Sequence, residues 1–309
     1  MNTSALHFRG QRTRFWLALL CVLLHTSSVY SQSRITRIAV LDLGRTATGL
    51  RAAEEIRGMF LTKQPSASGR EFDIIDPDQS RAAALGAGFE GSLNLTVQQA
   101  RDLGAAIGCD FYFIGEAQTV RRSPSTKPIY YESYATIFLV SARTGRLVLW
   151  ERPTVQRDSP EESEKALRAI LSAEETRQRY VGVLRRVRED ESAERGAASE
   201  SGAPLIEVMS DDDNDASGDV RTPRPYRRLK PPYPQTAAIA EVEATVDVLI
   251  DIDARGEIGR VEIARWAGYG LDQSVIETVR QMHFFPAMRD GVAIPMRVLL
   301  RYNFRKPPK

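Results

Sequence analysis

The chain has 309 residues, of which 42% are apolar and 27% are charged, a composition typical of globular proteins. This length accommodates two ordinary domains and their connections. A formal net charge of +2 is too small to indicate nucleic-acid binding, so we expect no nucleic acid among the partners.

The N-terminal segment combines three arginines with an apolar run of about 15 residues. A membrane span needs about 20 residues, so the run is short for one. Val29 and Ser31 fit the −3 and −1 positions of a signal-peptidase site. We expect residues 1–31 to be a signal peptide, cleaved between Ser31 and Gln32, that delivers the mature chain to the periplasm. The alternative is a short uncleaved anchor in the inner membrane, with the rest of the chain facing the periplasm.

Residues 34–190 alternate between strand and helix patterns. The predicted strands are 35–43, 71–78, 110–120 and a pair within 130–153, and the predicted helices are 47–63, 80–85 and 95–108. This order predicts an α/β domain with a mixed sheet. A further helix begins at Ser159, where serine caps, Pro160 takes the first position and Glu162 completes a capping box. Its helical pattern runs to about residue 188. A polar stretch interrupts the pattern, so the sequence is compatible with one helix or with two.

An acidic segment follows. From Glu189 to Asp219 the chain has eleven acidic residues and one basic residue. Such a composition cannot bury enough apolar surface to offset the entropy of ordering, so we interpret residues 191–225 as a flexible linker. Its aspartates alternate as in a calcium loop, but Ala216 replaces the required glycine and the final glutamate is missing, which argues against calcium.

Residues 226–309 predict a second domain of α+β class with the order β-β-α-β. A strand over 242–253 alternates strictly between apolar and polar residues, and Gly256 closes a tight turn to the return strand. Asp272 is expected to cap the next helix, and the last strand covers 296–305. Acidic residues of the first strand and arginines of the last would pair if the two strands are neighbours, for about 0.2–1 kcal/mol each.

The stretch 283–295, HFFPAMRDGVAIP, is interpreted as a structural corner. The helix must end before Pro286, because the residue before a proline avoids the helical region. Phe284 or Phe285 is expected to close the core there, and Gly291 to turn the chain. Pro295 begins the last strand and suits a sheet edge, because proline cannot donate to a ladder.

Several motifs of this region occur in order: Pro232-Tyr233-Pro234, the hairpin at Gly256, Ala267-Gly268, Leu271-Asp272, Phe285-Pro286-Ala287, and Gly291 with Pro295. Together they resemble the C-terminal domain of the TonB family of energy transducers over residues 229–306. The resemblance implies recognition by strand addition, in which a sheet edge receives an extended peptide of an outer-membrane receptor. The partner-binding residues it implies are Pro232, Tyr233, Pro234, Arg297, Val298, Leu299, Leu300, Arg301 and Tyr302. The alternative is that the last strand is buried or self-paired, for example in a homodimer.

Residues 34–190 resemble the periplasmic domain of CsgG-like and LpoB-like envelope proteins, through IAVLDL, FDIIDPDQ, LGAAIGCDFYFIGEA and ARTGRLV. These are mostly core and turn residues, so they imply a fold more than an activity. The sequence as a whole therefore predicts a two-domain protein, α/β followed by α+β, joined by the acidic linker.

No catalytic residue, metal or cofactor is expected. Signal cleavage would leave one cysteine, Cys109, and one histidine, His283, which excludes an internal disulfide and a histidine-rich metal site. Cys109 is interpreted as a small buried residue. The G-x-G-x-x-G at 86–91 does not lead directly from a strand into a helix, as a dinucleotide site requires.

The sequence thus predicts a non-enzymatic envelope protein that binds an outer-membrane receptor or another envelope protein. The alternative is a membrane-anchored TonB energy transducer that also meets an inner-membrane motor complex. Anchors of that family carry a serine and a histidine four residues apart, and Cys21 and His25 have this spacing with cysteine in place of serine.

Overall fold

The computed structural model describes residues 35–61, 71–125, 128–200, 208–210 and 220–306. The predicted cleavage residues Ser31 and Gln32 and the anchor pair Cys21 and His25 lie outside these ranges. None of the helices in the described part of the chain is long and apolar enough to cross a membrane.

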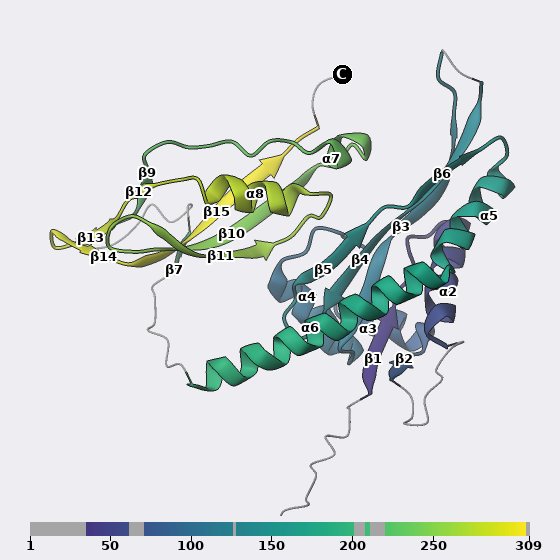
Figure 1. The fold of residues 1–309 in the computed structure, drawn as a ribbon, viewed down its shortest axis with the longest axis horizontal. Helices are drawn as coiled ribbons and strands as arrows, with labels where there is room; N and C mark the ends of the chain where they lie inside the picture. The colour runs from purple at the N-terminus through teal and green to yellow at the C-terminus, as the bar shows by residue number, and fades with distance from the viewer. Residues whose placement is uncertain (1–34, 62–70, 126–127, 201–207, 211–219, 307–309) are drawn as a thin grey trace, which may run out of the picture. The chain divides into compact units, whose positions relative to one another are not determined.

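The N-terminal region, residues 35–200, is built on a mixed sheet (Figure 1). The strand order is β2-β1-β3-β4-β5, with β6 paired to β4. β1 pairs in parallel with β2 and β3, and the other pairs are antiparallel, so the sheet is mixed, as predicted. Its elements are β1 (Thr36–Val40), α2 (Ala47–Leu61), β2 (Phe72–Ile74), α3 (Pro77–Gly86), α4 (Val97–Ile107), β3 (Phe111–Arg122), β4 (Tyr130–Ser141), β5 (Leu147–Glu151), β6 (Thr154–Arg157), α5 (Pro160–Leu171) and α6 (Glu174–Glu200).

Local signals fix several helix ends. The Thr96 hydroxyl accepts a hydrogen bond from the Gln99 amide while the Gln99 side chain accepts one from Thr96, a complete capping box at the start of α4. Gly108 ends α4 with φ 76°, which a side chain would disfavour. The Ser159 hydroxyl caps α5. The helical pattern after Ser159, which the sequence could not assign to one helix or two, forms two helices, α5 and α6.

The C-terminal region, residues 220–306, contains a sheet of order β11-β10-β15-β7, with helix α8 packed against it (Figure 1). The predicted β-β-α-β order is present as β10, β11, α8 and β15. Its elements, together with β7 from the preceding segment, are β7 (Val208–Ser210), β8 (Val220–Arg221), β9 (Arg224–Pro225), α7 (Gln235–Ile239), β10 (Ala244–Ile252), β11 (Ile258–Arg265), α8 (Leu271–Val279), β12 (Phe284–Phe285), β13 (Ala287–Arg289), β14 (Val292–Ile294) and β15 (Met296–Phe304).

The expected cross-strand charge pairs are confirmed. β10 and β15 are antiparallel neighbours in a register that sets Asp247 opposite Arg301 and Asp251 opposite Arg297. Arg301 Nε donates to Asp247 Oδ1 at 2.8 Å, and Arg297 Nη2 donates to Asp251 Oδ2 at 2.8 Å. Both pairs are bidentate, which fixes the register as well as the charge balance.

The corner differs from its prediction in detail. α8 already ends at Val279, and the two phenylalanines form the short strand β12, which pairs with β9. Phe284 closes the core with 1% exposure, whereas Phe285 is 58% exposed and packs edge-on against Tyr226. Asp290 and Gly291 both have positive φ in the turn between β13 and β14, which is the geometry of a tight hairpin.

The helix start at Asp272 also differs. Gly270 is the N-cap, and the Asp272 carboxylate instead accepts the backbone amides of Ala267 and Gly268, each at 2.8 Å. Asp272 therefore fixes the loop before α8 rather than the first turn of the helix.

Residues 201–207 and 211–219 of the predicted linker, 191–225, lie outside the described residues, and the described parts of it form helix and strand. α6 continues to Glu200, because Glu191 is buried against the turn between β4 and β5: Ser141 Oγ donates to it at 2.5 Å and Arg143 Nε at 2.7 Å. Composition does not reveal these long-range partners. Farther along, β7, β8 and β9 pair with β15, β13 and β12.

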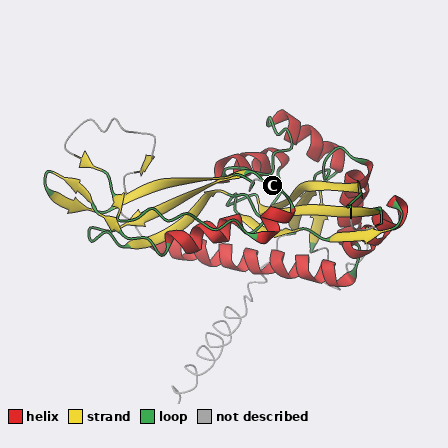
Figure 2. Ribbon diagram, turned by 90° about the horizontal axis from the view of Figure 1, so that it is seen from above, coloured by secondary structure: helices red, strands yellow, loops and turns green. Residues whose placement is uncertain are grey.

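Two hydrophobic clusters fill the interior, and helices lie on both sides of the N-terminal strands (Figure 2). On one face of that sheet, Phe113 packs with Ile56 of α2 and Leu184 of α6. The cluster on the other face contains Tyr112 and Phe138 and also the buried residues of the C-terminal region. The described residues from 35 to 306 consequently form one compact unit in which the two regions share a core.

Candidate partner-binding edge

Strand β15 has one buried and one charged face. Met296, Val298 and Phe304 are buried in the cluster that also contains the apolar residues of α8. Arg297 and Arg301 extend from the opposite face, where they pair with the aspartates of β10. This alternation anchors β15 through its side chains, while its backbone forms one side of the sheet.

The chain itself adds a strand beside β15. β7 pairs with it in parallel, with Val208 opposite Arg297, Met209 opposite Val298 and Ser210 opposite Leu299. The sequence analysis gave self-pairing of the last strand as the alternative to partner binding. Here the pairing occurs within one chain and involves a strand of three residues. The backbone of β15 at Arg297–Leu299 is therefore geometrically able to accept a parallel strand on the side away from β10.

The other side of the sheet meets the N-terminal region. Thr96 forms an isolated β-bridge with Arg265 at the end of β11. The Asn94 amide nitrogen donates to the carbonyl oxygens of Thr245 at 2.8 Å and Trp266 at 2.7 Å, and its oxygen accepts from the Thr245 amide at 3.1 Å. The Asn94 side chain thus makes the hydrogen bonds that a neighbouring strand would make to Thr245 of β10, at the point where β11 ends.

Trp266 fixes the two regions together. Its ring is 1% exposed and stacks on Phe138 of β4 with centroids 5.7 Å apart. Its Nε1–H donates to the Gly145 carbonyl at 3.0 Å. Tyr269 extends the cluster, with ring centroids 5.8 Å from Phe138 and 5.5 Å from Trp150. Because Trp266, Phe138 and Tyr269 are buried and the indole N–H of Trp266 has its acceptor, this is a permanent contact.

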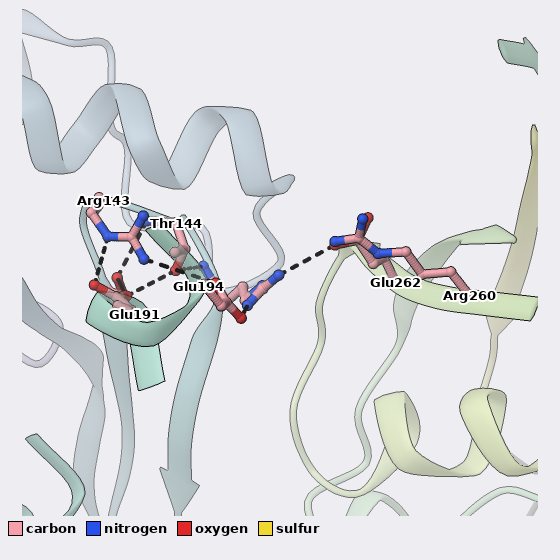
Figure 3. Close-up of polar contacts among 8 residues, drawn as sticks. Arg143, Thr144, Glu191, Glu194, Arg260 and Glu262 are labelled. Atoms are coloured by element: carbon pink, nitrogen blue, oxygen red, sulfur yellow. Dashed lines mark hydrogen bonds and ion pairs between the residues drawn. The ribbon is translucent and has the colours of Figure 1, made fainter. Parts of the chain in front are cut away.

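A chain of ion pairs runs beside this cluster (Figure 3). Arg146 joins Glu194 of α6 at 2.8 Å to Glu262 of β11 at 3.2 Å, and Glu262 also pairs with Arg260 at 2.6 Å. The hydrogen bond from Arg146 holds the pKa of the Glu194 carboxyl below its usual range. Glu194 is half exposed, so we assign the contact mainly a positioning role.

Burial shifts the pKa values of the Asp272 carboxyl and the Cys109 thiol strongly. Burial raises the pKa of Asp272 to about 6, although two backbone hydrogen bonds favour its charged form. Burial raises the pKa of the Cys109 thiol to about 12, so the thiolate needed by a nucleophile is scarce near neutral pH. Within the described ranges, histidine, cysteine and carboxylate side chains form no group of three that could hold a metal ion.

The family described as Gram-negative bacterial TonB protein C-terminal matches residues 230–305. Residues 230–305 are a TonB C-terminal domain. A curated relative, Protein TonB of Vibrio cholerae, is 32% identical over 79 residues, which make up 25% of this chain and 32% of that protein. The chain thus matches about a third of that relative's length.

Solved structures also match. The solution NMR structure of the Pseudomonas aeruginosa TonB C-terminal domain has 22% identity, covers 33% of this chain and 96% of that chain, and gives a TM-score of 0.26. The LpoB C-terminal domain from Escherichia coli has 14% identity, covers 45% of this chain and 94% of that chain, and gives a TM-score of 0.24. Scores this low carry no argument, so the resemblance of residues 34–190 to CsgG-like and LpoB-like proteins stays a prediction.

The Pro-Tyr-Pro motif of the TonB C-terminal domain lies near the end of β15. The Tyr233 ring is 6.2 Å from the Phe304 ring, and its hydroxyl donates to the Val242 carbonyl at 2.5 Å. The Pro232 carbonyl accepts a hydrogen bond from Ser274 of α8 at 2.6 Å. The motif therefore braces the sheet and α8, and its contacts with a partner stay a prediction.

Sequence reasoning missed Asn94 and Trp266, which join the domain to the N-terminal region. Trp266 directly follows the alternating strand β11, where a large aromatic residue signals burial. Its partners lie more than 100 residues away in sequence, so no local pattern identifies them.

Proposed function

We propose that this chain is a non-enzymatic bacterial envelope protein that binds an extended peptide by β-strand addition to β15. The partner is the terminal segment of an outer-membrane receptor or of another envelope protein, and the process is TonB-related transport or envelope assembly. The binding residues are those of β15 from Arg297 to Tyr302, with the Pro-Tyr-Pro motif at the end of the strand.

The observation that supports this proposal is the placement of β7. A three-residue strand is a small amount of sheet, and it lies on the side of β15 that a partner would use. The end of β11 on the other side of the sheet already carries Asn94 and Thr96. A longer partner strand would exchange with β7 and form more ladder hydrogen bonds than β7 does.

The test is titration of the full chain with peptides from the N-terminal segments of outer-membrane receptors of the same bacterium. The matched control is the best binding peptide with N-methyl groups on alternate residues, which keeps the side chains and removes ladder donors. Two methylated versions are made, one at the odd and one at the even positions of the peptide. Strand addition predicts that at least one of them loses binding. Equal affinity for all three peptides would contradict it.

We propose a periplasmic location for the mature chain. The membrane-anchored energy transducer is the second candidate, supported by the match to Protein TonB of Vibrio cholerae. Cell fractionation followed by N-terminal sequencing separates the two. A chain that starts at Gln32 in the soluble periplasm supports the first, and an intact N-terminus in the inner membrane supports the second.

A further inference from the structure

A cleft of about 600 Å³ lies between the outer face of the C-terminal sheet and the N-terminal region. On the sheet side it is lined by Asp247 and Leu249 of β10, by residues of β11, and by Leu299 and Arg301 of β15. On the other side it is lined by α4 and by the turn between β4 and β5. The edge strand and the N-terminal region therefore border the same cavity.

The cleft is electropositive. Five arginines line it, Arg101, Arg143, Arg146, Arg265 and Arg301, against two carboxylates, Asp247 and Glu262. Both carboxylates are already neutralised. Asp247 pairs with Arg265 at 3.2 Å and Arg301 at 2.8 Å, and Glu262 pairs with Arg146 and Arg260. Arg143 and Arg146 also pair with Glu191 and Glu194 outside the lining, and positive charge still exceeds negative charge when these two glutamates are counted.

Arg101 stands out within this lining. It lies on α4 and is exposed, and its side chain forms no hydrogen bond or ion pair with any residue that the structure describes. Arg143, on the neighbouring turn, is partly committed to Glu191 at 2.7 Å (Figure 3). An arginine without a protein partner at the wall of a cavity can bind an incoming carboxylate without first breaking an ion pair.

The position of the cleft relates it to the edge strand. The ion pair between Arg146 and Glu262 and the bridge between Thr96 and Arg265 connect the two regions along β11. Leu299 and Arg301 line the cleft from β15, the strand that β7 joins. Alternate side chains of a strand added to β15 would project on the same face as Leu299 and Arg301.

We propose that this cleft is part of the peptide site, and that the N-terminal region, through Arg101, selects partner strands that carry an acidic side chain. The partner class is an extended acidic peptide that adds in parallel beside β15, with its carboxylate in the cleft. This inference rests on the proposed function, because the peptide must first pair with β15.

The experiment uses the full chain carrying Met209→Pro and two synthetic peptides. The substitution prevents β7 of the same chain from pairing with β15. The first, LIEVMSDDD, has the sequence of residues 205–213, and the second, LIEVMSNNN, replaces its three aspartates with isosteric amides. Binding is measured by calorimetry at low and physiological salt, because a charge contribution weakens with screening. A second host, Met209→Gly, serves if proline impairs folding.

The acidic peptide is expected to bind more tightly than the amide peptide, and Arg101→Gln is expected to reduce that preference about two- to fivefold. Arg121→Gln is the matched control: it removes one exposed arginine from β3, outside the cleft lining, and should leave the preference unchanged. Equal affinity for both peptides, or equal losses in the two variants, would overturn the cleft assignment and leave strand addition intact. Binding of neither peptide to either host would overturn strand addition itself.

Discussion

Replacing Trp266 tests whether the two regions share one core. Trp266→Ala removes a side chain that is 1% exposed, its stack on Phe138 and its hydrogen bond to the Gly145 carbonyl. Truncation of a buried aromatic residue costs about 3–5 kcal/mol of stability. This is a large share of the free energy of unfolding of a typical protein, which is about 5–15 kcal/mol. Trp266→Phe keeps a ring for the stack and leaves one buried carbonyl without its donor, so it should cost about 1–3 kcal/mol.

The assay is urea unfolding followed by far-ultraviolet circular dichroism, with both variants and the wild type at the same pH. Tyr226→Ala is the matched control, because this aromatic residue is 59% exposed and should cost less than about 1 kcal/mol. The order of loss should be Ala, then Phe, then the control. A cost for Trp266→Ala no greater than that of Tyr226→Ala would refute the shared core.

Three further predictions concern the C-terminal region. Gly256→Ala should cost at least about 2 kcal/mol in thermal or urea unfolding, because φ is +84° and the new Cβ would lie 1.8 Å from the Phe284 carbonyl oxygen; Gly259→Ala, whose Cβ meets only an ordinary contact, should cost less. Because Asp272 has its pKa raised to about 6, the folded state binds its proton more tightly than the unfolded state. The contribution of Asp272 to the free energy of unfolding should therefore fall by about 1 kcal/mol as pH rises from 5 to 7. Asp272→Asn should remove this contribution. The same pH dependence of urea unfolding in the variant and the wild type would contradict this. Met209→Pro should raise the affinity for a strand-adding peptide severalfold in calorimetry, because β7 no longer competes for β15; an unchanged or lower affinity would show that β7 does not occupy the binding edge.

The sequence predicts the C-terminal sheet well because its information is local. The strict alternation of β10 and β15 reveals the buried face, and it places acidic residues and arginines on the opposite face, where they pair because the strands are neighbours. The structure adds which residues pair, Asp247 with Arg301 and Asp251 with Arg297. Gly256 marks the hairpin because only glycine adopts its backbone conformation without strain. These features depend on residues a few positions apart.

The contacts that join the regions depend on residues far apart in the chain. Asn94 replaces a strand for Thr245, and Glu191 extends α6 into the predicted linker through Ser141 on β4. Neither partner can be read from periodicity or composition. Glu191 and Glu194 looked entirely solvated because the arginines with which they pair, Arg143 and Arg146, lie in an earlier hairpin.

Amide hydrogen exchange along β15 shows directly whether a peptide adds at this edge of the sheet. The full chain carrying Met209→Pro is compared with and without saturating LIEVMSDDD peptide. Strand addition predicts new protection at β15 amides that point away from β10, with little change along β11. Binding without added protection on β15, or with protection centred on β11, would contradict strand addition at this edge.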